Sequence, residues 1–251
     1  MITLTDYISE SILSSTHTGK VHLDEEMKKY DLNPAKATLN ADGTIDYDGI
    51  VNLSYKGLTN LSKLPFRFRN VNGSFFCYHN KLTTLEGAPS SVRGTFNCYS
   101  NNLTNLDYCP QFIGGSFYCY YNGLTSLKGG PAQVNDNYVC SYNRLTTLEG
   151  APKEIKGIFN CSCNQLTSLK HCPDVIKNAF ICHDNFLTSL KDGPKQVNAS
   201  YDCTFNELTS LEGLPKKLND TLYCHNNISN FTEEDVLAVC NIKKSNIRTT
   251  Q

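Results

Sequence analysis

A pattern of apolar and polar positions repeats every 21 residues through most of this chain. In each repeat an aliphatic residue is followed by an aromatic residue, a cysteine and an asparagine, and then by two leucines and a proline. A unit of this length cannot bury an apolar face by itself, so the period predicts a solenoid in which each coil packs on its neighbours. The cysteines that mark the eight regular repeats are Cys77, Cys98, Cys119, Cys140, Cys161, Cys182, Cys203 and Cys224.

The spacing within a repeat predicts the direction of each side chain. The aromatic residue and the cysteine lie two positions apart, as in Phe75 and Cys77, so both should face the core from one short strand. The repeated asparagine, Asn80 in this coil, is expected to bond the backbone of adjacent coils, because a buried amide without partners is costly. The proline, here Pro89, excludes helix from the return segment, which must be extended or polyproline-like.

A column of small residues lies two positions after the aliphatic column. Seven of its eight members are Gly, Asn or Asp, the residues that tolerate positive φ, so we predict a turn there that leads into the strand. The column comprises Gly73, Gly94, Gly115, Asp136, Gly157, Asn178, Ala199 and Asp220.

The two ends of the chain depart from the repeat and predict caps. We expect an N-terminal helical and hairpin cap over residues 1–46. A solenoid of about nine 21-residue coils should follow over residues 47–231. A C-terminal helical cap and tail should occupy residues 232–251, because the exposed ends of such arrays need a covering unit.

The N-terminal cap is expected to contain two short helices and a hairpin. An apolar stripe at helical spacing, Leu4, Ile8 and Ile12, predicts the first helix, and the charged residues 21–31 predict the second. Residues 39–47 contain an Asp-Gly turn between alternating residues, which predicts a hairpin that leads into the first coil.

The C-terminal cap is expected to contain one helix. Thr232-Glu233-Glu234-Asp235 resembles a capping box, which predicts a helix from there to about Cys240. The polar tail from Lys243 to Gln251 is expected to be frayed.

The repeat resembles a known family. The run F-x-C-x-x-N-x-L-T-x-L occupies the places of L-x-L-x-x-N-x-L-x-x-L in leucine-rich repeats, over about residues 47–231. The short, proline-bearing unit is similar to the bacterial type found in secreted effectors of enteric pathogens, and its cysteine-bearing form resembles repeat proteins encoded by large tailed bacteriophages. The resemblance implies a right-handed solenoid of mainly short parallel β-strands with extended return segments and small helical caps. The sequence lacks the ubiquitin-ligase-like C-terminal domain of the effectors, so that activity is not implied.

The first ten residues resemble the capsid-targeting leader of internal head proteins in large tailed phages, which ends in an Ile-x-Glu cleavage signal, here Ile8-Ser9-Glu10. This resemblance implies a component of the virion that is packaged through its N-terminal helix. We favour the simpler interpretation, in which an amphipathic helix folds over the first coil.

The composition of the chain limits the cellular compartments and the classes of partner to be expected. The chain carries 23 basic and 24 acidic residues, so a general attraction to nucleic acid or to an anionic membrane is not indicated. No apolar run is long enough for a transmembrane helix, and residues 1–10 lack the features of a secretory signal. Twelve cysteines without an export signal favour free thiols in a reducing compartment, which we expect to be a bacterial host cytoplasm.

Cysteine and histidine are common catalytic and metal-binding residues, but their spacing along this sequence does not favour either role. The cysteine column occupies one core position in each coil, between Phe and Leu positions, where Cys behaves as a small hydrophobe. The one local cluster is Cys161 and Cys163 with Cys172, and metal sites need ligands that converge from close spacings. His183 and Asp184 are adjacent on a strand, so we expect their side chains to diverge.

Other motifs are also incomplete. Acidic residues around Gly43 suggest a calcium loop, but Thr38 and Gly49 occupy the first and twelfth positions of an EF-hand there, so a polar hairpin is favoured. The sequence has no G-x-S-x-G, Walker or H-E-x-x-H motif. We therefore expect no enzymatic activity, no cofactor and no metal.

The positive functional signal lies in strand positions that alternate with the core and face the expected concave sheet. Tyrosine is enriched at interface hot spots, so these residues predict a partner-binding face. The alternative is a purely structural ladder of stacked rings. The candidate residues are Phe76, Tyr78, His79, Tyr99, Tyr118, Tyr120, Tyr121 and Tyr142.

The sequence therefore predicts a non-enzymatic module that binds another protein, encoded by a phage and directed at a host protein. The alternative is a virion component. Binding of single-stranded nucleic acid by stacking on the tyrosines is less favoured, because such proteins combine their aromatic residues with a basic groove.

Overall fold

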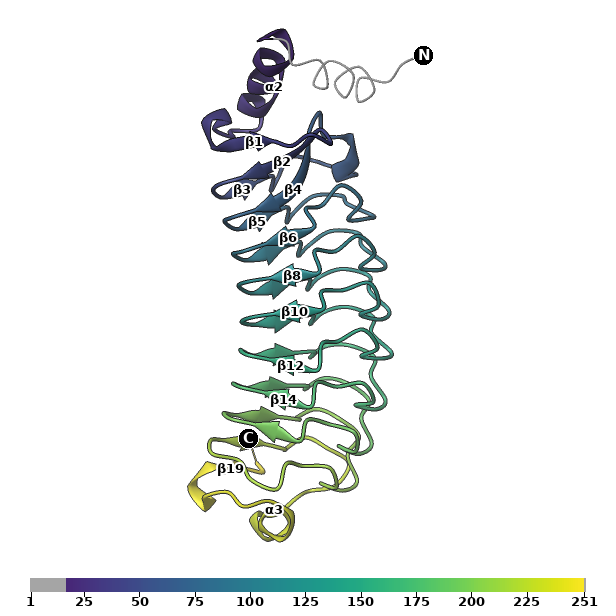
Figure 1. Ribbon diagram of the computed structural model, residues 1–251. Helices are drawn as coiled ribbons and strands as arrows, with labels where there is room; N and C mark the ends of the chain where they lie inside the picture. The colour runs from purple at the N-terminus through teal and green to yellow at the C-terminus, as the bar shows by residue number, and fades with distance from the viewer. Residues whose placement is uncertain (1–16, 251) are drawn as a thin grey trace.

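The computed structural model describes residues 17–250 and forms an elongated stack of coils, with α2 and α3 at opposite ends (Figure 1). The helix expected over Leu4–Ile12 and the resemblance of residues 1–10 to a capsid-targeting leader both lie outside the described residues. The stack is a parallel β-solenoid, as the 21-residue period predicts.

A ten-stranded sheet runs the length of the stack, with one strand from each coil. Every neighbouring pair in this sheet is parallel, and aromatic residues of successive coils are in register, as in Phe75 opposite Phe96. The backbone ladder continues past the two-residue strands, because the amide of Cys77 donates to the carbonyl of Asn97 at 2.9 Å. The strands are β3 (Val51–Asn52), β5 (Phe75–Phe76), β7 (Phe96–Asn97), β9 (Phe117–Tyr118), β11 (Tyr138–Val139), β13 (Phe159–Asn160), β15 (Phe180–Ile181), β17 (Tyr201–Asp202), β18 (Leu222–Tyr223) and β19 (Ile247–Arg248).

A second set of short strands lies at the aliphatic column, just before the turn into the first sheet. The return segment was predicted to be extended, and its strands pair from coil to coil in one six-stranded and one three-stranded sheet. Pairing is parallel except between β1 and β2, which form the N-terminal hairpin. The strands are β1 (Ala37–Leu39), β2 (Thr44–Tyr47), β4 (Arg67–Val71), β6 (Ser91–Val92), β8 (Phe112–Ile113), β10 (Gln133–Val134), β12 (Glu154–Ile155), β14 (Val175–Ile176) and β16 (Gln196–Val197).

The apolar columns meet in one continuous core. Aliphatic, aromatic, cysteine and leucine columns are all fully or almost fully buried, which confirms the predicted inward directions. Phe75 and Phe96 stack with ring centroids 5.6 Å apart, and Phe159 and Phe180 stack at 5.9 Å. Burial of these rings and leucines supplies most of the stabilisation between coils, since hydrophobic burial dominates folding.

The asparagine column forms the predicted amide ladder. Nδ2 of Asn164 donates to the carbonyls of Cys140 and Cys161, both at 3.1 Å, so it bonds both the preceding coil and its own. Its Oδ1 accepts from the amide of Leu145 at 2.9 Å. The same pattern recurs in Asn185, and each of these amides therefore links two coils.

The prediction of positive φ at the small-residue column is wrong. Gly73, Gly94, Gly115 and Gly157 are not among the residues with positive φ. They are small because coils approach closely there: a Cβ on Gly73 would lie 2.3 Å from the carbonyl oxygen of Gly49. Positive φ falls instead on the residue that precedes each ladder asparagine, with values between 50° and 55° in His79, Ser100, Tyr121, Tyr142, Cys163, Asp184, Phe205 and Asn226.

The aromatic column varies together with a position eight residues upstream. Tyr138 and Tyr201 replace the usual phenylalanine, and Gly130 and Gly193 lie where other coils carry residues such as Ala88. A Cβ on Gly130 would lie 3.2 Å from the hydroxyl oxygen of Tyr138, and one on Gly193 would lie 3.5 Å from that of Tyr201. Gly130 therefore leaves room for the hydroxyl group of Tyr138, whereas a Cβ at position 193 would be in ordinary van der Waals contact with that of Tyr201.

The N-terminal end is covered by helix α2 (His17–Lys29), a 3₁₀ turn (Pro34–Lys36) and the β1–β2 hairpin. The second predicted helix is confirmed but begins before residue 21, and the hairpin turns at Gly43, where φ is 78°. A second 3₁₀ turn (Leu61–Lys63) lies in the first coil. The hairpin is tied to β4 by an ion pair between Asp46 and Arg69, with an N···O distance of 2.5 Å.

The C-terminal end is covered by helix α3 (Glu233–Val239), a 3₁₀ turn (Lys244–Asn246) and β19. The capping box between Thr232 and Asp235 is confirmed. The prediction of a frayed tail from Lys243 is wrong up to Arg248, because β19 pairs with β18 and Ile247 is buried against the last coil. An apolar residue in a polar tail thus closes the sheet.

Candidate functional site

Nine aromatic residues form a connected network on the outer face of the ten-stranded sheet, over its N-terminal half. The structure brings all eight predicted residues together and adds Tyr55 from the first coil. Their binding role stays a prediction. This network, called here the aromatic sheet face, comprises Tyr55, Phe76, Tyr78, His79, Tyr99, Tyr118, Tyr120, Tyr121 and Tyr142.

The rings stack in ladders that run across the coils. Tyr78 and Tyr99 have centroids 4.9 Å apart, and Tyr99 and Tyr120 have centroids 4.5 Å apart with planes inclined by 3°. A second ladder then begins, in which Tyr121 and Tyr142 stack at 4.4 Å. The surface is consequently built from preordered rings, which lose little conformational entropy when a partner covers them.

The left-handed turn column projects its side chains outward. Tyr121 and Tyr142 have φ near 52° and are 51% and 48% exposed. The following asparagine holds this turn: Nδ2 of Asn143 donates across the bend at Tyr142 to the carbonyls of Cys140 and Ser141, which precede it. Tyrosine in this conformation is strained, and the amide ladder stabilises it.

Three phenols of the aromatic sheet face have a raised pKa and keep their proton at physiological pH: Tyr99, Tyr120 and Tyr142. Burial raises the pKa of Tyr99 and of Tyr120 above the usual value for tyrosine. The pKa of Tyr142 is raised to about 12, mainly because its hydroxyl group is hydrogen-bonded with the Cys163 thiol. The surface thus offers apolar ring area with hydroxyl groups able to donate and accept.

The tyrosine ladders do not continue into the C-terminal half of the sheet, where Phe205 and Tyr223 are the exposed aromatic residues of these columns. Ser141, Ser162 and Thr204 take the positions of Tyr78, Tyr99 and Tyr120 and are buried. The coil backbone is unchanged there, with φ between 51° and 55° at the turn column from Cys163 onward. The fold therefore does not require aromatic residues at these positions.

Cys163, His183 and Asp184 meet in this C-terminal half. The prediction that His183 and Asp184 diverge is wrong, because Nδ1 of His183 lies 2.6 Å from Oδ2 of Asp184. Asp184 has φ of 52°, so the strand alternation that would separate neighbouring side chains has ended at this residue. The Sγ atom of Cys163, from the preceding coil, lies 4.0 Å from the same carboxylate oxygen.

All twelve cysteines are free thiols, and eleven of them are buried. Burial raises the pKa of the column thiols well above the usual value, as in Cys98 and Cys140, and to about 12 in Cys224. The thiol of Cys140 donates to the carbonyl oxygen of Asn160 at 3.4 Å. These cysteines pack in the core, and Cys163 is the partly exposed one.

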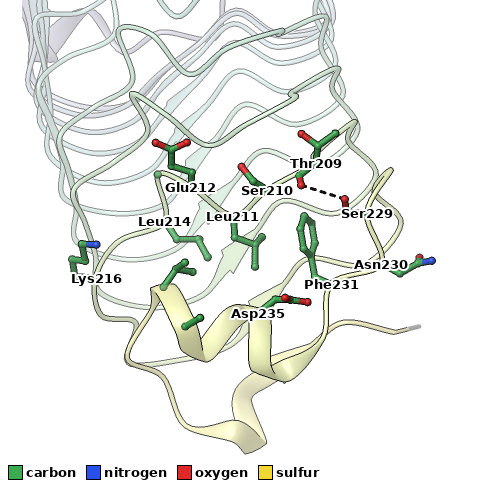
Figure 2. A pocket seen from close by; sticks show the side chains of 13 residues that line it. Thr209, Ser210, Leu211, Glu212, Leu214, Lys216, Ser229, Asn230, Phe231 and Asp235 are labelled. Atoms are coloured by element: carbon green, nitrogen blue, oxygen red, sulfur yellow. Dashed lines mark hydrogen bonds between the residues drawn. The ribbon is translucent and has the colours of Figure 1, made fainter.

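A groove lies between the last regular coil and helix α3 (Figure 2). Leu211, Leu214 and Phe231 line its base. Several polar groups at its rim are engaged in contacts that hold the cap: the Ser229 hydroxyl donates to the Thr209 carbonyl oxygen at 3.2 Å. The groove is therefore the joint between the solenoid and its C-terminal cap.

Among the helices that the structure describes, none combines the length and apolarity needed to cross a membrane. No protein-family model matches the chain, and no curated protein sequence does either.

The fold is similar to that of a bacterial leucine-rich-repeat protein of known structure. The match is to YopM, a leucine-rich effector protein from Yersinia pestis, with a TM-score of 0.50 and 21% sequence identity over 71% of this chain. The chain spans about half of that protein, 49% of its length. At this identity the likeness shows the fold alone, a leucine-rich-repeat solenoid.

Proposed function

We propose that this protein is a non-enzymatic binding module that holds a protein partner on its aromatic sheet face. The observation that carries the proposal is the confinement of the stacked tyrosine ladders to one half of a sheet. The other half keeps the same backbone with Ser141, Ser162 and Thr204 in the ladder column, although Phe205 and Tyr223 are single exposed rings there. Stacking of each pair contributes about 0.5–1.5 kcal/mol to stability, but the C-terminal coils fold without it. A binding role explains the asymmetry, whereas a purely structural ladder does not.

The chemistry of the face indicates the kind of partner. Neutral phenols and a partly exposed phenylalanine favour a protein surface with apolar side chains and backbone groups for hydrogen bonding. We further propose that the protein is phage-encoded and acts on a host protein in a bacterial cytoplasm. The support is the resemblance of the cysteine-bearing repeat to phage-encoded proteins and the twelve free thiols, which suit a reducing compartment.

The test is an affinity capture from bacterial lysate with the intact chain and with the double variant Tyr99→Ala/Tyr120→Ala, followed by calorimetry on any purified partner. Two hot-spot tyrosines should together weaken binding by at least about 30-fold. The matched control is Tyr108→Ala, an exposed tyrosine outside the network, which should leave the affinity unchanged. Thermal melting of each variant checks that the solenoid stays folded.

Equal affinity of the intact chain and the double variant would exclude the aromatic sheet face as the binding surface. Capture of oligonucleotides at low salt, lost in the same variant, would replace the protein partner with single-stranded nucleic acid. The virion alternative makes a separate prediction: mature protein isolated from particles would lack residues 1–10 on N-terminal sequencing.

A further inference from the structure

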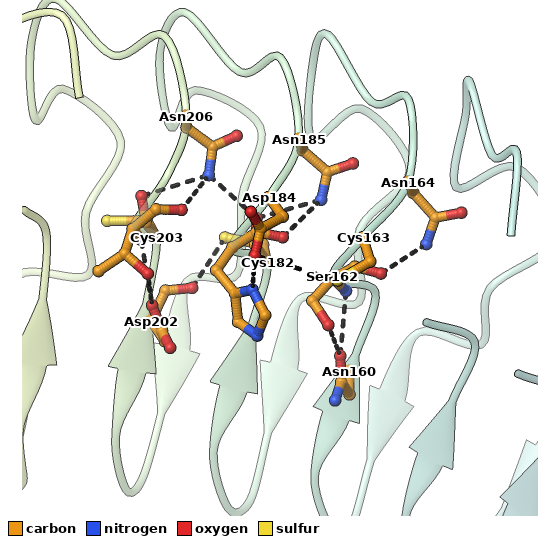
Figure 3. Close-up of polar contacts among 12 residues, drawn as sticks. Asn160, Ser162, Cys163, Asn164, Cys182, Asp184, Asn185, Asp202, Cys203 and Asn206 are labelled. Atoms are coloured by element: carbon orange, nitrogen blue, oxygen red, sulfur yellow. Dashed lines mark hydrogen bonds and ion pairs between the residues drawn. The ribbon is translucent and has the colours of Figure 1, made fainter. Parts of the chain in front are cut away.

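Three potential metal ligands from two adjacent coils converge on the outer surface of the solenoid. Cys163 follows β13, and Asp184 follows β15 one coil later, beside it in Figure 3. The Sγ of Cys163, a ring nitrogen of His183 and a carboxylate oxygen of Asp184 all lie within 4.8 Å of one another. We propose that these three side chains form a Zn²⁺-binding site.

The donor set and spacing suit zinc. Thiolate, imidazole and carboxylate are the three ligand types that Zn²⁺ uses in proteins. Tetrahedral coordination at usual bond lengths needs about 3.3 Å between nitrogen and oxygen and about 3.5 Å between sulfur and oxygen. The present distances are 2.6 Å from His183 Nδ1 to Asp184 Oδ2 and 4.0 Å from Cys163 Sγ to the same oxygen. Each changes by less than about 1 Å on binding, which rotation of exposed side chains supplies.

The backbone that carries these ligands is already fixed. Cys163 and Asp184 have φ of 53° and 52°, and the amide of Cys163 donates to the carbonyl oxygen of His183 at 3.0 Å. Nδ2 of Asn185 donates to the same carbonyl oxygen at 3.2 Å (the neighbouring ladder contacts are drawn in Figure 3). The two coils therefore hold the ligands in place before a metal arrives, which lowers the cost of binding.

The cluster is specific to this place in the repeat. Across the part of the chain that the structure describes, no other three His, Cys, Asp or Glu side chains bring ligand atoms together in this way. The set has no close spacing such as C-x2-C, which is the usual sequence signature of a zinc site. In a solenoid, residues about 20 positions apart are spatial neighbours, so the ligands assemble between coils.

The proposed site is open on one side. The side chains of His183 and Asp184 are 28% and 51% exposed, and Cys163 is partly exposed. Three protein ligands leave a fourth position for water or for a ligand from another molecule. A thiolate and a carboxylate together offset the charge of the divalent ion. The site adjoins Tyr142, at the end of the aromatic sheet face.

The test uses the purified full chain, reduced and stripped of metal, titrated with Co²⁺ as a spectroscopic substitute for Zn²⁺. We expect one equivalent to give a thiolate-to-cobalt charge-transfer band and intense tetrahedral d–d bands, both removed by added Zn²⁺. Cys163→Ser should abolish the charge-transfer band. His183→Gln and Asp184→Asn should each weaken Co²⁺ binding by more than about 100-fold, since even residues behind metal ligands contribute 10- to 100-fold. The matched control is His225→Gln, which removes a histidine from the same column two coils away.

A second readout follows the accessible thiol. A thiol reagent should modify Cys163 in the native chain, and Zn²⁺ should block this reaction in the intact chain and in His225→Gln but not in His183→Gln. Melting curves confirm that each variant is folded. The proposal is overturned if the intact chain gives no cobalt bands, or if the bands persist unchanged in all three ligand variants.

Discussion

Replacing Asn164 with leucine tests whether the asparagine ladder holds adjacent coils together. The side chain is 7% exposed, donates to the carbonyls of Cys140, Cys161 and Ser162, and accepts from the amide of Leu145. All three carbonyls keep another partner: Asn143 and Asn185 donate to those of Cys140 and Cys161, and the amide of Tyr142 donates to that of Ser162. The amide of Leu145 loses the Asn164 oxygen that it donates to.

The expected cost follows from this difference. The orphaned N–H costs about 1–3 kcal/mol, and loss of the bonds from the two Nδ2–H groups to carbonyls costs about 1–3 kcal/mol. Burial of the more apolar leucine returns about 1–2 kcal/mol. From the central values, Asn164→Leu should lower the free energy of unfolding by about 2.5 kcal/mol, measured by urea titration followed by circular dichroism. Asn102→Leu, at an exposed position in an earlier coil, should change it by less than about 0.5 kcal/mol.

Two double variants test whether neighbouring asparagines stabilise the fold by donating to the same backbone carbonyl. Asn164→Leu with Asn185→Leu deprives the carbonyl of Cys161 of both its asparagine partners, so their joint cost should exceed the sum of the single costs by about 1–3 kcal/mol. Asn101→Leu with Asn185→Leu shares no acceptor and should be additive. Additivity in both pairs, or a single cost no larger than that of the exposed control, would refute the reasoning.

Two further predictions concern the core and the N-terminal cap. Cys140→Ser should lower the free energy of unfolding by about 1–2 kcal/mol, because it buries a more polar group in a fully enclosed position. Cys163→Ser, at a partly exposed position, should change it by less than about 0.5 kcal/mol. Equal melting temperatures of the two variants would contradict the core placement of Cys140. Hydrogen bonds from Arg69 lower the pKa of Asp46, so this contact stabilises the fold above the ordinary carboxyl pKa of about 4 and is lost as the pH falls through the folded-state pKa. Asp46→Asn should cost less than about 1 kcal/mol at neutral pH and flatten the acid dependence of urea unfolding; an unchanged acid profile would count against it.

The period predicted the solenoid and the direction of its core columns because each repeat position meets its equivalent in the next coil. The left-handed turn was misplaced for a different reason. Tyr121 and Tyr142 have no intrinsic preference for positive φ, and the amide of the following asparagine imposes it. Residues such as Gly73 instead report the close approach of neighbouring backbones. Residue type alone does not separate these two causes.

The candidate surface was predictable to the extent that its residues alternate with the core. Tyr55 was missed because the first coil carries three extra residues, although alignment of Val51 with Phe75 places Tyr55 level with His79. The contact between His183 and Asp184 was missed because strand alternation was extended one residue too far. Both errors arise where the backbone leaves the regular pattern.

The close approach of Tyr138 to Gly130 determines which 21-residue segment can be moved as a unit within this array. A coil exchanged by a cut between these two positions would join tyrosine to an alanine or a cysteine, or glycine to a phenylalanine, and so create an overlap or a void in the core. A cut placed after Cys140 keeps each glycine with its own tyrosine. Recombination between repeats, and the construction of longer arrays from them, should therefore succeed at one junction of the 21-residue unit and fail at another.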